Sequence, residues 1–164
     1  MTEDSPDQSQ HEAVEYANPL AAIPATGRIL GLDLGSKTIG VAVSDGMRYS
    51  ATPLETIKRT KFTADAIRLD QLIAENAIVA IILGLPLNMD GSEGPRVQST
   101  RAFARSLAQR IALPIAFWDE RLSTSAVTRM MIEADMRRDR RAEVVDKLAA
   151  SYILQGALDR LRHA

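Results

Sequence analysis

The sequence predicts an α/β domain built on a mixed five-stranded sheet, with three antiparallel strands followed by parallel β-α units and helices flanking the sheet. Two observations support this fold class. Short apolar, β-branched runs alternate with segments whose apolar residues have helical spacing. The first two runs are joined only by a Gly-containing turn, which is typical of a β-hairpin. A meander that passes into β-α units gives a sheet that is antiparallel at one edge and parallel at the other.

The first half of the chain supplies three strands and a helix. Residues 29–32 and 38–43 are the two apolar runs of the hairpin. Residues 51–57 predict a third strand, which we place at an edge of the sheet because Pro53 cannot donate a ladder hydrogen bond. Residues 61–76 have the apolar spacing of an amphipathic helix.

The second half begins with the most apolar strand of the chain. Residues 78–83 are uninterrupted and rich in isoleucine, which predicts a strand covered on both faces. A loop dense in glycine and proline follows over residues 84–94. Pro95 suits the first turn of a helix that we extend to about residue 112. Residues 115–118 predict the last strand.

Two helices complete the expected order. Ser123 is a suitable N-cap for a helix that ends near residue 134. An arginine-rich stretch, residues 137–141, interrupts the pattern, and a broad apolar face predicts a final helix over residues 142–161. In sheets of this kind, binding sites form at the carboxyl ends of the parallel strands.

The composition is that of one globular domain. Of the 164 residues, 46% are hydrophobic and 25% are charged, and there is no cysteine, so disulfides and thiolate metal sites are excluded. Both histidines lie near the termini. A metal would therefore be bound by oxygen, which favours Mg²⁺ or Mn²⁺. No apolar run approaches the ~20 residues of a membrane span, and no signal peptide is recognisable. We expect a cytoplasmic protein without membrane contact.

Residues 1–26 differ from the rest of the chain. They hold five acidic residues, three prolines and no lysine or arginine, so we expect a disordered acidic extension. The domain is then expected to cover residues 27–164, with 16 of the 21 acidic residues and all 20 basic ones. A mildly basic domain is compatible with nucleic-acid binding, but also with many other functions.

Three acidic residues have an unusual setting. Asp33 ends an apolar strand, Glu120 ends the strand predicted over residues 115–118, and Asp146 shares a helix face with alanine and isoleucine. Carboxylates gathered at one end of the sheet would repel one another, and a divalent cation removes that repulsion. Two such ions about 4 Å apart can activate a water and stabilise the leaving oxygen in phosphodiester cleavage. Together the three acids predict a metal site.

Each acid also has an ordinary explanation when it is taken alone. Asp33 is a common residue at the start of a glycine-containing turn. Glu120 has Arg121 beside it as an ion-pair partner, and Asp146 is compatible with a core acid bonded to one arginine. The combination and the order of the elements favour the metal site.

Two groups of cations adjoin these acids in the sequence. Lys37, in the Gly35-Ser36-Lys37 turn, offers one charge and nearby N–H groups to a backbone phosphate, although an ordinary hairpin turn explains the same residues. Four arginines precede Asp146 and would steepen the salt dependence of nucleic-acid binding, unless they form a solvated charge run. The four are Arg137, Arg138, Arg140 and Arg141. Since aromatic residues make up only 4% of the chain, we expect recognition of shape and backbone rather than base stacking.

Four motifs closely resemble the YqgF/RuvX family, Holliday-junction-resolvase-like proteins associated with pre-16S rRNA processing. The motifs are GLDLGSKTIGVAVSD (31–45), GLPLNMDGSEGP (84–95), DERLST (119–124) and VVDKLAASYILQ (144–155). The resemblance extends over residues 27–161. It implies a ribonuclease H-like fold and an Mg²⁺- or Mn²⁺-dependent nuclease that acts on structured RNA, such as pre-16S rRNA, or on branched DNA.

The resemblance also assigns roles to individual residues. It implies that Asp33, Glu120 and Asp146 are the catalytic and metal-binding acids. Lys37, Arg121 and the four arginines before Asp146 are the residues that we expect to contact nucleic acid.

Two other functions remain compatible with parts of the sequence. ATPases of the actin and sugar-kinase type share this fold and its Asp-x-Gly phosphate loop, but they need two such domains, and residues 27–164 supply one. A non-catalytic rRNA-binding assembly factor would need the basic residues only, and the three intact acids argue against it. A junction resolvase would need a two-fold dimer to cut symmetrically, whereas a monomer is sufficient for an RNA-trimming enzyme. The sequence leaves a monomer and a homodimer open.

Overall fold

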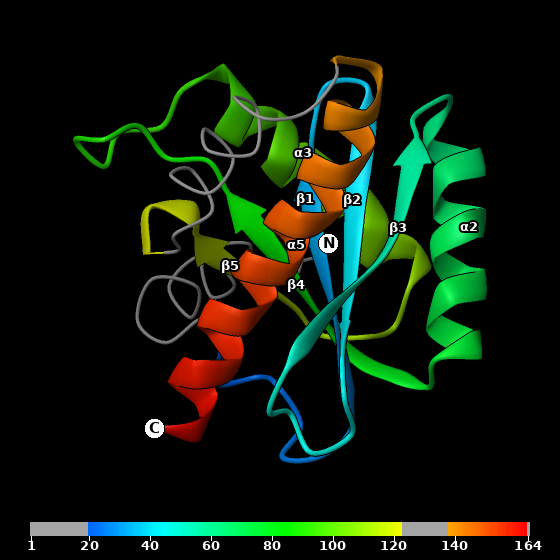
Figure 1. Ribbon diagram of the computed structural model, residues 1–164, viewed down its shortest axis with the longest axis vertical. Helices are drawn as coiled ribbons and strands as arrows, with labels where there is room; N and C mark the ends of the chain where they lie inside the picture. The colour runs from blue at the N-terminus through cyan, green and yellow to red at the C-terminus, as the bar shows by residue number, and fades with distance from the viewer. Residues whose placement is uncertain (1–19, 123–137, 164) are drawn as a thin grey trace, which may run out of the picture.

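The computed structural model describes residues 20–122 and 138–163, with side chains of the last helix described from residue 146 onward. Its core is a five-stranded sheet in the order β3-β2-β1-β4-β5 (Figure 1). The strands are β1 (Arg28–Leu34), β2 (Thr38–Ser44), β3 (Ala51–Lys58), β4 (Ile78–Leu85) and β5 (Ile115–Asp119). The helices are α2 (Phe62–Glu75), α3 (Pro95–Arg110) and α5 (Arg138–Arg162), with a 3-10 turn, η1 (Glu120–Leu122), after β5.

The pairing of the strands confirms the expected mixed sheet. Strand β1 pairs antiparallel with β2 and parallel with β4, and β5 continues the parallel half. Strand β3 forms the antiparallel edge, as Pro53 predicted, and the ladder shifts register between Val41 and Ala42 opposite that proline. The sequence expectation therefore holds for both the strand types and the edge.

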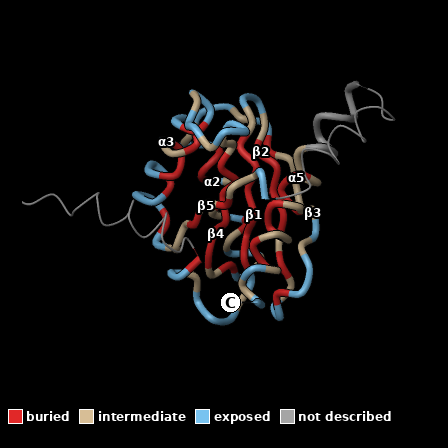
Figure 2. Tube along the Cα trace, turned by 90° about the vertical axis from the view of Figure 1, so that its left-hand side faces the viewer, coloured by how far each residue is buried: buried red, intermediate tan, exposed pale blue. Residues whose placement is uncertain are grey.

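Alternation of side chains along the strands divides the core into two layers. Leu30, Leu32 and Leu34 of β1 pack with α2 and α3 on one face of the sheet, whereas Ile29 packs on the opposite face with α5. Strand β4 contributes to both layers, with Ile81 on the α2/α3 side and Ile82 on the α5 side. Figure 2 shows the buried residues concentrated along the strands between the helices. Burying a side chain of this size contributes roughly 1.5–3 kcal/mol.

Helix α5 lies across the sheet (Figure 1), and small residues on β1 let it approach closely. A Cβ on Gly31 would lie 2.7 Å from Cβ of Leu154, which is closer than two such carbons pack. Ala150, Ile153 and Leu154 of α5 are fully buried against this face. The face covered by α5 is called the α5 face below.

The ends of the chain differ from the expectations in two ways. Helix α5 begins at Arg138, one turn before the predicted start at residue 142, because arginine is a strong helix former. Leu20, within the expected extension, is buried with Ile23 packed beside it on the α5 face. Residues 1–19 of the expected extension and the helix expected over residues 123–134 lie outside the described residues.

Within the described part of the chain, no helix is long and apolar enough to cross a membrane.

Candidate active site

Asp33 lies on the α5 face at the carboxyl end of β1. Side chains of a strand alternate between the two faces, so Asp33 shares its face with Gly31 and Ile29, both of which contact the α5 layer. Its side chain is buried, with 4% of the residue exposed. A carboxylate this deep needs a compensating partner, since an unpaired buried charge is strongly unfavourable.

Asp146 reaches Asp33 from the β2 side. Gly40 of β2 is the register partner of Asp33 in the antiparallel ladder, and directly opposite residues in such a ladder point to the same face. A Cβ on Gly40 would collide with the backbone carbonyl of Asp146. The turn of α5 around Asp146 therefore rests on β2 next to Asp33, and only a glycine at position 40 allows this contact.

Glu120 approaches Asp33 from the opposite side, through a second glycine. Leu32 is registered with Leu83, so Asp33 and Gly84 come next on the neighbouring strands β1 and β4. A Cβ on Gly84 would lie 2.8 Å from Oε1 of Glu120. The side chain of Glu120 therefore lies over Gly84 on the α5 face.

The three predicted acids thus lie on the α5 face, near the carboxyl ends of β1 and β4, in the order Glu120, Asp33, Asp146. Adjacent strands are about 4.8 Å apart, so this row spans roughly 10 Å. Among the residues that the structure describes, no three or more Asp, Glu, His or Cys side chains form a group that could hold a metal ion. The packing over Gly40 and Gly84 therefore puts the three acids on one face, but their carboxylates do not close around a single point.

Thr38 fixes the position of the Asp146 carboxylate. The hydroxyl of Thr38, at the start of β2, donates a hydrogen bond to Oδ2 of Asp146. Asp146 is half-buried, and the residues that follow on the same helix face, Ala149 and Ala150, are buried. The sequence singled out Asp146 for this packed setting, but it gave no indication of Thr38 as its partner.

Arg121 has partners within the protein. Its guanidinium donates to both oxygens of Asp119, with Nη2 2.7 Å from Oδ2, and this bonding raises the pKa of Arg121. Nη1 also lies 3.4 Å from the carbonyl oxygen of Met89. Arg121 therefore connects the end of β5 to the β4–α3 loop, and any contact with nucleic acid has to compete with Asp119.

The β4–α3 loop, residues 86–94, is held by its own hydrogen bonds. Oδ1 of Asp90 accepts from the backbone N–H of Ser92 at 2.9 Å and from its hydroxyl at 2.6 Å, and the hydroxyl bond is the main reason that the pKa of Asp90 is lowered. Glu93 pairs with Arg101 of α3. The acids of this loop are thus engaged in local structure.

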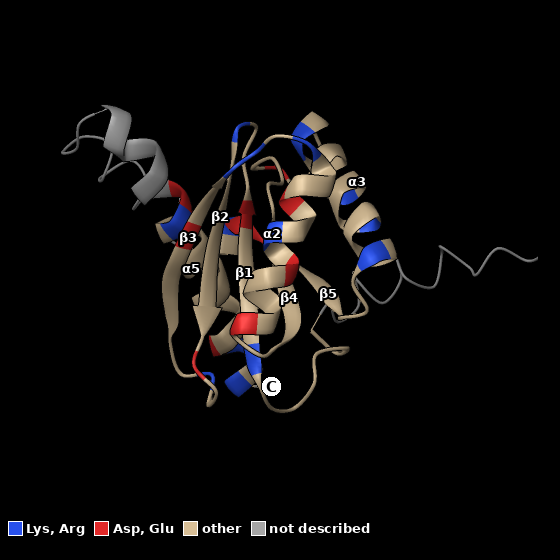
Figure 3. Ribbon diagram, turned by 90° about the vertical axis from the view of Figure 1, so that its right-hand side faces the viewer, with Lys and Arg blue, Asp and Glu red and all other residues tan. Residues whose placement is uncertain are grey.

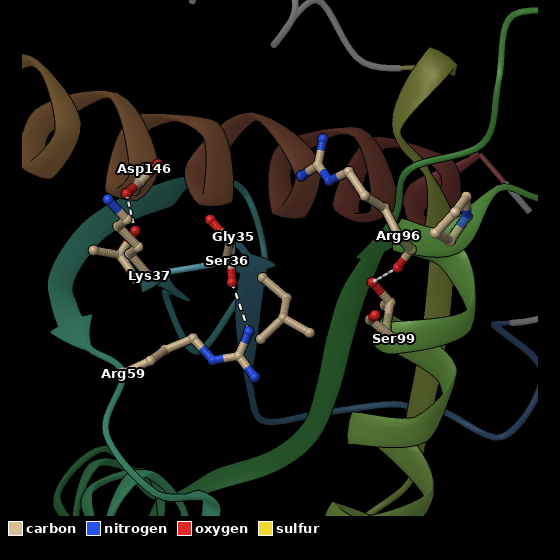
Figure 4. Close-up of a pocket in the computed structure, with 11 residues that line it drawn as sticks. Gly35, Ser36, Lys37, Arg59, Arg96, Ser99 and Asp146 are labelled. Atoms are coloured by element: carbon tan, nitrogen blue, oxygen red, sulfur yellow. Dashed lines mark hydrogen bonds between the residues drawn. The ribbon is translucent and has the colours of Figure 1, made fainter.

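A pocket of about 660 Å³ opens at this same edge of the sheet. It is lined by the β1–β2 turn, by Arg59 after β3, by the first turns of α3 and by Asp146. Figure 4 shows Arg59 and Arg96 extending from opposite sides toward the middle, where Gly35 and Ser36 lie. Of the three acids, only Asp146 lines the pocket, which therefore extends from Asp146 to the side of the sheet covered by α3.

Three cations line the pocket, and they are held differently. Nη1 of Arg59 donates to the carbonyl oxygen of Gly35 at 2.6 Å, which ties the β1–β2 turn down. Neither Lys37 nor Arg96 forms an ion pair with any described residue. Lys37 was expected from the sequence, whereas Arg59 and Arg96 were not. Their only sequence signal is position, since each is next to a loop that borders the site.

The arginine cluster can be located only in part. Arg137 lies outside the described residues. Arg138, Arg140 and Arg141 occupy the first turn of α5, one to two turns before Asp146, and their side chains lie outside the description. Figure 3 shows a second set of basic residues along α3, which carries four arginines and no acidic residue.

Comparison with known proteins places this chain in a family. The model of the RuvX family, described as "Holliday junction resolvase", matches residues 27–160. The chain belongs to the RuvX family. A relative from Cereibacter sphaeroides, named "Putative pre-16S rRNA nuclease", is 66% identical over 151 residues, which are 92% of this chain and 93% of the relative. A relative of the same name from Paracoccus denitrificans is 65% identical over 86% of this chain and 89% of its own length.

Solved structures support the expected fold of the RuvX domain. Thermus thermophilus RuvC in complex with a Holliday junction superposes with a TM-score of 0.55 over 84% of this chain and 97% of that one. The two sequences are 14% identical, so the likeness concerns the fold alone. The ribonuclease H-like fold implied by the sequence motifs is confirmed.

Proposed function

We propose that this chain is a divalent-metal-dependent nuclease that processes the 5′ end of pre-16S rRNA in ribosome biogenesis. Its family and its curated relatives make it a hydrolase of phosphodiester bonds. The observation that carries the proposal is the row of acids at one sheet edge. Asp33 is buried between two glycines, and Asp146 and Glu120 cover them. Carboxylates on neighbouring strands repel one another, and a divalent cation bound between them would remove that repulsion.

The donor chemistry of this row fits a hard divalent cation such as Mg²⁺ or Mn²⁺. Asp33, Glu120 and Asp146 provide carboxylate oxygens only, which these ions prefer. Because Gly40 and Gly84 lack side chains, Asp146 and Glu120 can pack onto the two strands that flank Asp33. Bound there, the ion would lower the pKa of a water and stabilise the leaving oxygen.

The residues around the row would orient both the acids and the substrate. Thr38 holds Oδ2 of Asp146, which limits the directions in which its carboxylate can point. Arg59 fixes the turn that carries Lys37. Lys37 and Arg96 offer their charges to the substrate strand, because no described residue neutralises them.

Cleavage of a labelled precursor tests this function. The RNA should carry the 5′ end of the small-subunit rRNA with its leader, and the protein should cleave it with Mn²⁺ or Mg²⁺ but not with EDTA. Asp33→Asn and Glu120→Gln should both be inactive while they keep the melting temperature of the native chain. Failure of the native protein to cleave with either ion would refute the proposal.

A second candidate is resolution of four-way DNA junctions, which the description of the RuvX family favours. Symmetric cleavage of a junction needs two active sites related by a two-fold axis. A parallel assay with a labelled junction, together with the mass of the protein in solution, separates the two functions. We propose that the RNA is the preferred substrate and that the protein acts in the cytoplasm. The mass in solution decides between a monomer and a homodimer.

A further inference from the structure

The pocket beside Asp146 extends around the end of the sheet from one face to the other. Leu34 points into the α2/α3 core layer, whereas Asp146 belongs to the helix on the α5 face, and both residues line the same pocket. The β1–β2 turn, residues 35–37, forms its floor. A strand whose scissile phosphate lies over the acids would therefore continue over this turn toward α3.

The lining of this pocket is strongly basic. Lys37, Arg59 and Arg96 contribute three positive charges, and Asp146 is the one acid among the lining residues. Ser36 and Ser99 add hydroxyl groups beside them (Figure 4). A site with two guanidinium groups and hydroxyl donors matches the oxygens of a phosphate, which arginine binds in a forked geometry.

We propose that this pocket binds an internal phosphodiester phosphate of the substrate strand, next to the scissile one. This assignment rests on the proposed nuclease function. Arg96 and Lys37 contact the phosphate, while Arg59 holds the turn through Gly35 and presents its remaining N–H groups to the pocket. At about 660 Å³ the pocket is larger than one phosphate group, so the sugar attached to that phosphate fits as well.

Arg96 and Arg105 form a matched pair for testing this assignment. Both are exposed arginines of α3, but Arg105 is about 13 Å further along the helix and does not line the pocket. Both glutamine variants remove one charge from the same helix. Arg96→Gln, and likewise Lys37→Gln, should lower the slope of log affinity against log salt by about 0.7–0.9. Arg105→Gln should leave that slope unchanged.

The position of the phosphate can be mapped chemically. Binding is measured in EDTA with the Glu120→Gln protein, which does not cleave, on RNAs that carry a single neutral methylphosphonate. A 2′-deoxy residue with a natural phosphodiester at the same place serves as the control. The Glu120→Gln protein should lose roughly tenfold in affinity at one internal position near the cleavage site. With Arg96→Gln added, the methylphosphonate at that position should no longer weaken binding. With Arg105→Gln added, it should weaken binding as before.

The opposite results overturn the assignment. One is that a methylphosphonate weakens binding equally in the Arg96→Gln and Arg105→Gln proteins at every internal position. The other is that binding depends only on a 5′-terminal phosphate. If Arg96→Gln fails to fold, Lys37→Gln carries the same comparison. Because no cleavage is involved, the test is separate from the nuclease function. A protein that cleaves but shows no coupling refutes only the phosphate site, and one that shows coupling but never cleaves refutes only the nuclease.

Discussion

Gly40 of β2 lies directly beneath the backbone carbonyl of Asp146 in α5, with no room for a side chain between them. Since Gly40 is also the register partner of Asp33, this single contact sets how close the two acids come. The distance between them is therefore determined by backbone packing and not by the side chains alone. A methyl group at position 40 would push the turn of α5 around Asp146 away from β2.

Gly40→Ala should consequently reduce both stability and activity. Overpacking of this kind costs about 1–3 kcal/mol, which lowers Tm by about 2–4 °C per kcal/mol in a chain of this size. Gly46→Ala is the matched control, because a Cβ there meets nothing within 4 Å, and its Tm should stay close to that of the native chain. Thermal unfolding of the two variants checks this. Equal Tm values for both would show that α5 does not rest on Gly40.

Thr38→Val should impair cleavage without unfolding the protein. Valine keeps the branched shape of threonine and its preference for strands, but it cannot donate to Oδ2 of Asp146. Loss of such an orienting hydrogen bond costs roughly 10–100-fold in metal affinity or activity. We expect the Mn²⁺ concentration for half-maximal cleavage to rise. Thr38→Ser should restore most of the activity, and a serine variant as weak as the valine variant would contradict an orienting role.

Asp146→Asn should abolish cleavage and leave Tm unchanged or raised. The substitution removes one negative charge from the neighbourhood of Asp33 and thereby reduces repulsion in the absence of metal. Activity should fall about a thousandfold or more, as expected for a residue that acts at the reacting centre. Thermal unfolding in EDTA alongside the cleavage assay measures both effects. A Tm lowered by many degrees would instead identify Asp146 as a structural acid.

The ion pair between Glu55 and Arg68 should make stability depend on pH. Arg68 donates to both oxygens of Glu55, at 2.8 and 2.6 Å, and this hydrogen bonding lowers the pKa of Glu55 below its ordinary value of 4.5. A lowered folded-state pKa adds stability above pH 4.5, and that stability is lost as the pH falls through the folded-state pKa. The contribution is small, since both side chains are about one-third exposed.

Urea unfolding at pH 7 and pH 3 tests this pair. Glu55→Gln should be less stable than the native chain at pH 7, and this difference in stability should become smaller at pH 3. Glu75→Gln is the control, because its carboxylate oxygen lies 3.9 Å from Arg68 and makes a weaker contact. A deficit in Glu55→Gln that is the same at both pH values would show that the charge of Glu55 is not involved.

Much of the fold could be predicted because local patterns determine it. The apolar run of β4 and the glycine-containing turn after β1 specify a buried parallel strand and a hairpin, and both are present. The start of α5 was predicted one turn late because its first residues are arginines without an apolar pattern. The burial of Leu20 was missed because a single apolar residue within an acidic segment gives no periodicity.

The sequence drew attention to the three acids that lie on the α5 face, but it did not predict their surroundings. Asp33 and Asp146 are recognisable because each is a carboxylate within an apolar pattern. The roles of Gly40 and Gly84 depend on strand register and on where α5 crosses the sheet, which no local pattern encodes. Arg59 and Arg96 meet at one pocket although they come from separate elements, so only the folded structure brings them together.

The central claim is that Asp33, Glu120 and Asp146 share a divalent cation at the edge of the sheet. Anomalous diffraction from crystals grown with Mn²⁺ tests it most directly. The claim predicts a manganese peak within bonding distance of the Asp33 carboxylate and of at least one of the other two acids, with no such peak in Asp33→Asn crystals. A peak bound elsewhere, or none beside Asp33 at saturating Mn²⁺, would contradict it.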